Sequence, residues 1–321
     1  MPIVDMSLEE LRAYKGINPK PDDFDQYWER ALDEMEEVDP CIKIVKARFR
    51  ARNSECFDLY YTGVRNARIH VKYLRPRNYQ DKLPAVLHFH GYAGHAADFS
   101  ELLKWSGEGY AVFAMDCRGQ AGQSEDTGGV AGNTLRGHII RGLEDKNPDN
   151  LLFRHIFLDV AQLAKIVASL DCVDRNRIYA TGGSQGGALT VVSAALSSVI
   201  KKAAPVYPFL SDYKRVWEMD MAERAYEELK QYFRDFDPRH EREEEIFYKL
   251  GYIDLHNMAS RITAEMKFIS ALMDNVCPAS TQFSIYNNLN CKKSMVIYPD
   301  YGHEPLLEAE NIVMEFFMQD D

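Results

Sequence analysis

The stretch TGGSQGGAL, from Thr181 to Leu189, sets one serine among four glycines. Gly182 to Gly186 read G-x-S-x-G, with Ser184 at the centre. The preceding RIYATG is typical of a strand, and the following GGALTVVSAAL is typical of a helix. A strained turn in this context projects a nucleophilic serine, and the glycines avoid collisions with the neighbouring backbone. An ordinary glycine-rich connection is the alternative, whereas a phosphate loop is disfavoured because no Gly-Lys-Ser/Thr follows.

A serine nucleophile needs a base that removes its proton. In a strand–turn–helix site of this kind the acid and then the histidine follow Ser184 in the chain. Three histidines lie downstream, namely His240, His256 and His303. His303 follows the strand-like SMVIYPD, which places it on a loop at the C-terminal end of a strand, and we predict that it is the base. The other two lie in a charged segment, where we expect solvated or helix-capping histidines.

The acid that orients the base is predicted to be Asp274. This residue ends KFISALMD, again at a strand terminus, with a loop following. Asp300 is the main rival, but it lies three residues before the histidine and is better suited to organising that loop. Asp212 and Asp254 flank the charged segment, and we expect them to be turn or helix-cap residues.

An oxyanion in the transition state needs hydrogen-bond donors. The backbone N–H of Gln185, directly after the nucleophile, is the first predicted donor, and the N–H of Tyr92, after the early strand AVLHFH, is the second. His88 and His90 are expected to pack or to brace that loop, because no acidic or cysteine partner is spaced for a metal site. We therefore expect neither a metal nor a cofactor.

The elements that must position these residues follow a regular order. Three β-like runs, Cys41–Phe49, Cys56–Thr62 and Arg68–Leu74, suit an antiparallel beginning. From Ala85 onward, apolar strand-like runs alternate with helical patterns, including a helix over about 150–170. This alternation predicts an α/β fold with a mostly parallel central sheet flanked by helices.

We predict one domain over residues 1–321. Residues 1–38 form an N-terminal helical arm in this prediction, beginning with a capping box from Ser7 to Glu10. Residues from about 211 to 264 are charged, aromatic and helical in pattern, and they interrupt the strand alternation. We interpret them as a helical cap inserted between two core strands.

The composition of the 321 residues excludes several classes of partner. Hydrophobic residues make up 46%, enough for a large core, and the formal net charge of −11 disfavours nucleic acid and anionic membrane surfaces. The six cysteines form no CxxC pair, which favours a reducing compartment. The first residues show no basic segment followed by an apolar core, and no run of about 18 apolar residues follows. We expect a cytoplasmic protein.

Four motifs in order, HisGlyTyr at 90–92, ArgGlyGln at 118–120, the glycines at 182–187 and His303-Glu304, closely resemble the carbohydrate esterase family of acetyl xylan esterases and cephalosporin C deacetylases. The resemblance spans nearly the whole chain and implies the α/β-hydrolase fold. It also implies a serine esterase that deacetylates short xylo-oligosaccharides, other small acetylated sugars and cephalosporin C, and a homohexamer whose active sites face an internal cavity.

The family's triad matches Ser184, Asp274 and His303, and its oxyanion donors match Tyr92 and Gln185. The resemblance carries over three supporting residues of a structural motif, namely Arg118, Gly119 and Gln120. The residues AsnValCysProAla after the acid depart from the proline pair typical of the family.

An acetyl-specific site must exclude longer acyl chains. The aromatic ring of Tyr92 and the tyrosine- and phenylalanine-rich segment beginning at Tyr207 are candidates for that wall, with simple core packing as the alternative.

Two other functions remain open. An oligopeptidase-type serine peptidase shares the fold and the triad order, although the ArgGlyGln match and the lack of a propeller-like segment in these residues count against it. A catalytically silent hydrolase-fold binding protein is the second alternative, and the filled triad positions count against it.

Overall fold

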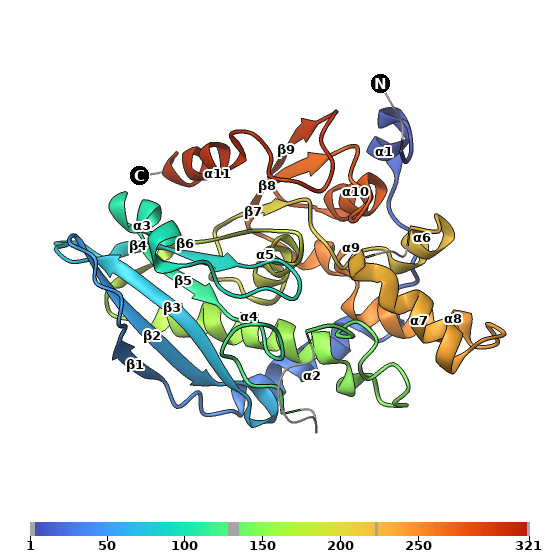
Figure 1. Cartoon of the computed structure of the whole chain (residues 1–321), viewed down its shortest axis with the longest axis horizontal. Helices are drawn as coiled ribbons and strands as arrows, with labels where there is room; N and C mark the ends of the chain where they lie inside the picture. The colour runs from blue at the N-terminus through green and yellow to red at the C-terminus, as the bar shows by residue number, and fades with distance from the viewer. Residues whose placement is uncertain (1–3, 128–134, 222–223, 320–321) are drawn as a thin grey trace.

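The structure is a computed structural model that describes residues 4–127, 135–221 and 224–319. Within these residues, strands form a single twisted sheet in the order β1-β2-β3-β5-β4-β6-β7-β8-β9 (Figure 1). The strands are β1 Lys43–Lys46, β2 Ser54–Thr62, β3 Arg68–Pro76, β4 Leu83–Phe89, β5 Ala111–Met115, β6 Val173–Gly183, β7 Lys202–Val206, β8 Glu265–Ala271 and β9 Lys293–Tyr298. The α-helices are α1 Leu8–Ala13, α2 Phe24–Glu36, α3 Phe99–Gly107, α4 Leu152–Ser169, α5 Gln185–Leu196, α6 Tyr213–Glu218, α7 Glu227–Phe236, α8 Glu243–Leu250, α9 Leu255–Met258, α10 Ala279–Asn288 and α11 Ala309–Met318.

The predicted direction of the strands is confirmed. β1, β2, β3 and β5 pair antiparallel in succession, and the pairs from β5 through β4, β6, β7 and β8 to β9 are parallel. The first strand is shorter than the predicted 41–49, since only Lys43–Lys46 pair with β2. Cys41 has a φ of 41°, which lies outside the β region and prevents the strand from beginning there.

Helices cover both faces of the sheet, as predicted. Along β4, Ala85 and Leu87 join the core that contains α4 and α5, whereas Val86 joins the core that contains α3 and α11. This division follows from the alternation of side chains along a strand. The central parallel strands β4 and β5 are therefore buried on both sides. The C-terminal ends of the parallel strands form the edge at which ligand sites of α/β sheets lie.

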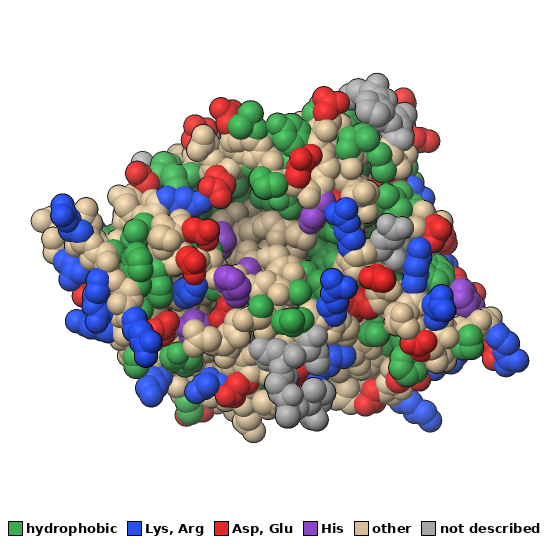
Figure 2. Space-filling view, viewed as in Figure 1, with side chains coloured by type: hydrophobic (Ala, Val, Ile, Leu, Met, Phe, Trp, Pro, Cys, Tyr) green, Lys and Arg blue, Asp and Glu red, His purple; other side chains and the backbone are tan. Residues whose placement is uncertain are grey.

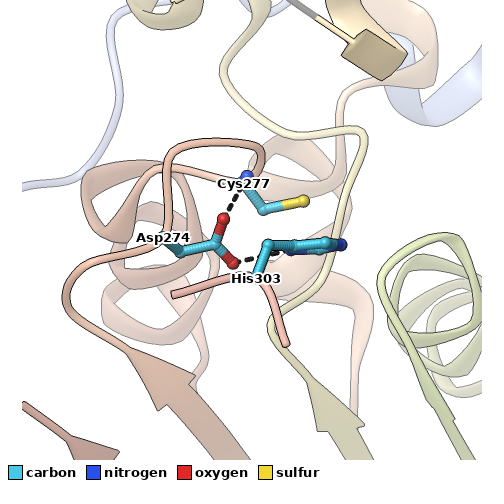
Figure 3. A group of neighbouring side chains, drawn as sticks. All are labelled: Asp274, Cys277 and His303. Atoms are coloured by element: carbon cyan, nitrogen blue, oxygen red, sulfur yellow. Dashed lines mark hydrogen bonds and ion pairs between the residues drawn. The ribbon is translucent and has the colours of Figure 1, made fainter. Parts of the chain in front are cut away.

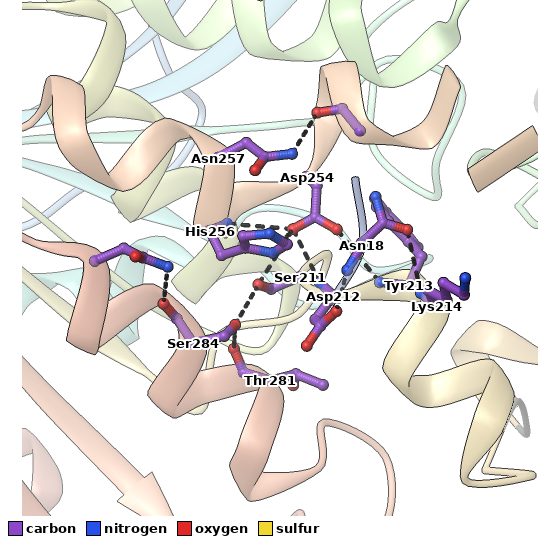
Figure 4. Close-up of polar contacts among 12 residues, drawn as sticks. Asn18, Ser211, Asp212, Tyr213, Lys214, Asp254, His256, Asn257, Thr281 and Ser284 are labelled. Carbon is purple, nitrogen blue, oxygen red and sulfur yellow. Dashed lines mark hydrogen bonds and ion pairs between the residues drawn. The ribbon is translucent and has the colours of Figure 1, made fainter. Parts of the chain in front are cut away.

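The N-terminal arm begins with the predicted capping box, in which Ser7 Oγ accepts the N–H of Glu10 and the Glu10 carboxylate accepts the N–H of Ser7. Farther along, a buried aspartate fastens the arm to the start of the predicted cap. Asp212 accepts hydrogen bonds from the N–H groups of Ile17 and Asn18, at 3.0 and 2.9 Å. Figure 4 shows Asp212 beside Asn18. Asp212 therefore holds two distant segments together and does not cap α6 with its side chain.

The segment predicted as a cap contains α6 to α9 between β7 and β8. Apolar side chains of α7 and α8, such as Leu229 and Phe247, belong to the same buried core as α4 and α5. His256 in this segment is 8% exposed and lies 2.8 Å from Asp254, so the expectation of a solvated or capping histidine is wrong there (Figure 4). Asp254 does cap α9, through the N–H of His256.

Candidate active site

Ser184 lies at the tip of a tight turn between β6, which ends at Gly183, and α5, which begins at Gln185. Its φ of 58° and ψ of −120° are strained for a residue with a side chain. A Cβ atom added to Gly182 or Gly186 would lie 2.5 or 2.1 Å from the carbonyl oxygen of β4 that faces them. The glycines are required because the backbone of β4 approaches the turn too closely for any side chain.

The three residues predicted to form a triad lie in hydrogen-bond contact. His303 Nε2 is 3.1 Å from Ser184 Oγ, and His303 Nδ1 is 2.8 Å from Asp274 Oδ2 (Figure 3 shows the second contact). Asp274 is 1% exposed, and its other oxygen accepts N–H groups from Val276 and Cys277, each at 2.8 Å. The arrangement can transfer a proton from the serine to an imidazole whose far side is held by a carboxylate.

The rival residues lie elsewhere. Asp300 is exposed, and His240 is exposed and pairs with Glu243 at 3.3 Å. His256 pairs with Asp254 in the cluster that fastens the arm. Among the predicted bases and acids, His303 is the one that contacts Ser184, and Asp274 is the one that contacts His303.

The sequence reasoning missed Cys277. Its side chain lies beside the imidazole of His303 (Figure 3), and the potential ligand atoms of Asp274, Cys277 and His303 lie within 4.8 Å of one another. Burial, and then the charge of Asp274, raise the pKa of the Cys277 thiol, while a hydrogen bond with Ser184 opposes the rise. Its position three residues after the acid, on the loop that carries the acid, was the available signal. Within the described parts of the chain, Asp274, Cys277 and His303 are the one group of three side chains placed closely enough to hold a metal ion. His88, His90 and His95 do not form such a group.

The first predicted oxyanion donor, the backbone of Gln185, belongs to the start of α5. Its buried side chain forms a reciprocal amide pair with Gln120, at 2.7 and 3.1 Å. Arg118 is buried and binds both oxygens of Asp159, at 2.7 and 2.5 Å. Gly119 between them has a φ of 73°, which glycine adopts freely. The ArgGlyGln segment thus connects the nucleophile turn with α4.

The loop that carries Tyr92 follows β4. His90 donates from Nδ1 to the carbonyl of Gly91 at 2.8 Å and accepts the N–H of Cys117 at Nε2, at 3.0 Å. His90 therefore braces the loop, as predicted, and burial lowers its pKa and favours the neutral ring. The hydroxyl of Tyr92 donates to Glu228 of α7, which the sequence did not single out.

Tyr207 lies against the base. Its ring centroid is 4.7 Å from that of His303, and a Cβ on Gly183 would lie 3.3 Å from the tyrosine ring. Burial raises the pKa of Tyr207 to about 12, so the phenol is neutral at ordinary pH. The ring also contributes to a cavity of about 310 Å³ between α3 and α11, together with Pro305 and Leu306. Figure 2 shows a hollow near the middle of the face viewed in Figure 1.

The sheet, the strained turn and the hydrogen-bonded serine, histidine and aspartate define an α/β-hydrolase. Comparison with known proteins then identifies the family. A profile of the acetyl xylan esterase (AXE1) family matches residues 1–320, and the chain belongs to this family.

Solved structures agree with this assignment. Acetyl xylan esterase 1 from Thermoanaerobacterium sp. JW/SL YS485 is 54% identical, with a TM-score of 0.94 and 98% of each chain covered. An acetyl xylan esterase from Paenibacillus sp. R4 is 35% identical, with a TM-score of 0.91 over 97% of this chain and 99% of the other. In sequence alone, the acetyl esterase Axe7A of Xylanibacter ruminicola is 27% identical, and the match covers 94% of this chain and 66% of that relative's length.

More distant structures share only the fold. An acylaminoacyl peptidase is 18% identical with a TM-score of 0.60, over 84% of this chain and 42% of its own. Separately, none of the described helices is long and apolar enough to cross a membrane.

Proposed function

We propose that this protein is a serine esterase that removes acetyl groups from acetylated xylo-oligosaccharides and other small acetylated substrates, including cephalosporin C. The observation that carries the proposal is the hydrogen-bonded relay from Ser184 through His303 to Asp274 in a chain of the acetyl xylan esterase family. The names of the two most similar structures described above support acetylated xylan as the source of the substrate.

The reaction proceeds in two halves. Ser184 Oγ attacks the carbonyl carbon of the acetyl ester while His303 Nε2 accepts the serine proton. The carbonyl oxygen becomes an oxyanion, which accepts hydrogen bonds from the backbone N–H groups of Gln185 and Tyr92. As the carbon–oxygen bond to the sugar breaks, His303 returns the proton to the departing alcohol, and an acetyl-enzyme remains.

Water completes the cycle. His303 removes a proton from a water molecule, which attacks the acetyl carbonyl, and a second oxyanion forms in the same place. Collapse of this intermediate breaks the bond to Ser184 Oγ, the serine regains its proton from His303, and acetate leaves. Neither half of the reaction needs a metal or a cofactor, because the serine side chain supplies the nucleophile and the backbone amides stabilise the oxyanion.

The decisive experiment uses the variant Ser184→Ala and a serine-reactive phosphonate. We expect the alanine variant to lose nearly all hydrolysis of p-nitrophenyl acetate and to gain no phosphonate mass, whereas the wild type gains one adduct. Ser193→Ala is a matched control, because Ser193 lies on α5 and bonds to the carbonyl of Thr190 inside that helix. Near-normal turnover by Ser184→Ala would refute the mechanism, and an unlabelled, inactive wild type would favour a silent binding protein.

A substrate panel separates the esterase from the peptidase. Acetylated xylo-oligosaccharides, acetyl monosaccharides and cephalosporin C should be hydrolysed, and blocked peptides should not. Faster cleavage of peptides would favour the oligopeptidase alternative.

Two further parts of the proposal concern the assembly and its location. We propose a homohexamer in the cytoplasm, on the basis of the family resemblance and of cysteines that are all unpaired. Light scattering at micromolar concentration tests the assembly. A monomer would refute the proposed hexamer but would leave the proposed esterase activity untouched.

A further inference from the structure

A carboxylate of the cap reaches the loop that carries Tyr92. Glu228, on α7, is 9% exposed, and its Oε1 accepts hydrogen bonds from Tyr92 Oη and from the N–H of Gly137 at 3.2 Å. Its Oε2 accepts the N–H groups of Ile139 and Ile140, at 2.7 and 3.3 Å. Four donors from two separate loops therefore converge on one carboxylate.

The surroundings of Glu228 suit a side chain that only accepts hydrogen bonds. A buried carboxylate is costly unless its oxygens are hydrogen-bonded, and all four donors around Glu228 point to those oxygens. Burial raises the pKa of Glu228, while the bonds from Tyr92 and the backbone oppose that rise. An amide at this position would present an NH₂ group to N–H donors and would break part of the cluster.

The other contacts of Tyr92 lead to the nucleophile. Its ring centroid lies 5.7 Å from that of Phe209, and the N–H of Phe209 donates to the carbonyl of Ser184 at 3.1 Å. The Tyr92 hydroxyl also accepts the N–H of His138 at 3.2 Å. Tyr92 is thus fixed between the cap carboxylate and a residue bonded to the nucleophile turn.

We propose that Glu228 is a positioning residue that fixes Tyr92, and through it the oxyanion loop, in the geometry the reaction needs. The proposal rests on the proposed esterase function, in which the N–H of Tyr92 is an oxyanion donor. Hydrogen bonds to an oxyanion accelerate a reaction only when the donors are already aimed at the place where the charge develops. A side chain anchored at its hydroxyl by the cap keeps the backbone of the same residue from drifting, so the cap takes part in catalysis without touching the substrate.

The test is a double-mutant cycle with Glu228→Gln and Tyr92→Phe. The Tyr92→Phe change removes only the hydroxyl of the side chain. Each single variant should lower kcat for p-nitrophenyl acetate by about 10-fold to 100-fold, with KM changed much less. This loss of kcat is smaller than the loss expected when an oxyanion donor is removed altogether. The double variant should be no slower than the slower single variant, because both changes break the same link. The rate of phosphonate labelling of Ser184 should fall in parallel, since that reaction also develops an oxyanion.

Asp237→Asn is the matched control. Asp237 is a buried carboxylate of the same cap, and it accepts the N–H groups of Glu241 and Arg242, both at 2.9 Å, at the start of α8. This variant can lose stability, but we expect its kcat to stay close to that of the wild type.

Several results would overturn the proposal. These are an unchanged kcat in a folded Glu228→Gln or Tyr92→Phe variant, losses that multiply in the double variant, or an equal loss of kcat in Asp237→Asn. If Glu228→Gln fails to fold, Tyr92→Phe alone decides. A wild type that neither hydrolyses the ester nor reacts with the phosphonate would instead refute the proposed function itself.

Discussion

The Nδ1 atom of His303 lies 2.8 Å from Oδ2 of Asp274, a residue 29 positions away in the chain. Asp300 is only three positions from the same histidine, yet it is exposed. The loop after β8 holds Asp274 in place through two backbone N–H groups, so the carboxylate faces the ring without adjustment. The residue that orients His303 is therefore not the aspartate nearest to it in the sequence. It is the aspartate that the loop after β8 places beside the imidazole ring.

The first prediction concerns this pair. Asp274→Asn should lower kcat by roughly 10⁴-fold, because the amide favours the wrong imidazole tautomer. Asp300→Asn, the matched control, should stay close to the wild type. Steady-state kinetics with p-nitrophenyl acetate decides the matter. A severe loss in Asp300→Asn with a harmless Asp274→Asn would show that the acid has been misassigned.

The second prediction concerns metal ions. EDTA should leave activity unchanged, but added Zn²⁺ should inhibit, because Asp274, Cys277 and His303 offer carboxylate, thiolate and imidazole ligands that zinc prefers. Binding would take His303 out of the relay, and EDTA should then restore activity. Cys277→Ser should need a higher Zn²⁺ concentration for the same inhibition.

Cys172→Ser is the control for that experiment, because Cys172 contacts Tyr73 and lies outside the site. Activity lost to EDTA and regained with a divalent ion would contradict the metal-free mechanism. Equal Zn²⁺ sensitivity in the wild type and Cys277→Ser would show that the thiol is not a ligand of the inhibitory zinc ion.

The third prediction concerns the acyl group. Each buried methylene would ordinarily contribute about 0.8 kcal/mol, so an open groove should favour long chains. Overpacking against a closed wall costs roughly 1–3 kcal/mol and can reverse this preference. We therefore expect kcat/KM to fall from p-nitrophenyl acetate to butyrate to octanoate. Tyr207→Ala should relax the preference if its ring, which lies against His303, forms part of the wall.

Phe236→Ala is a suitable control for the acyl series, because Phe236 is an exposed aromatic residue of the cap. A rise in kcat/KM toward octanoate would indicate a lipase-like esterase and would defeat the deacetylase proposal.

The fourth prediction concerns pH and the loop after β5. Asp116 accepts the N–H groups of Ala96 and Gln123, at 2.7 and 2.9 Å, and lies 2.7 Å from His70 Nδ1. Burial opposes ionisation, but these hydrogen bonds outweigh it and lower the pKa of Asp116 to about 2, from an ordinary value of 3.8. Because the folded pKa is the lower one, the stabilisation is complete above the unfolded pKa and is lost as the pH falls toward 2.

Asp116→Asn should accordingly reduce the free energy of unfolding at pH 7 by about 2 kcal/mol, and the difference from the wild type should shrink below about pH 4. Denaturant unfolding at several pH values measures this, with the exposed Asp81→Asn as control. A difference between wild type and variant that stays constant down to pH 3 would contradict the assignment of the ionised form.

Much of the fold and of the reacting group follows from local sequence. The turn around Ser184 is visible because a strand, a glycine-rich turn and a helix are each encoded by neighbouring residues. His303 and Asp274 can be predicted for a similar reason, since Asp274 ends the strand-like KFISALMD and His303 lies three residues after the strand-like SMVIYPD. The alternation of apolar runs and helical patterns likewise predicted the mostly parallel sheet, because burial on both faces leaves a continuous apolar signature.

Outside the predicted triad, only the tertiary structure decided which distant groups meet. Glu228 and Tyr92 are 136 positions apart, and nothing in the residues around either one indicates the other. The burial of His256 and the placement of the Cys277 thiol depend in the same way on how the cap and the loop after β8 pack. Periodicity records whether a residue faces a core, but the partner it meets there depends on the relative positions of whole elements, which packing of the complete chain determines.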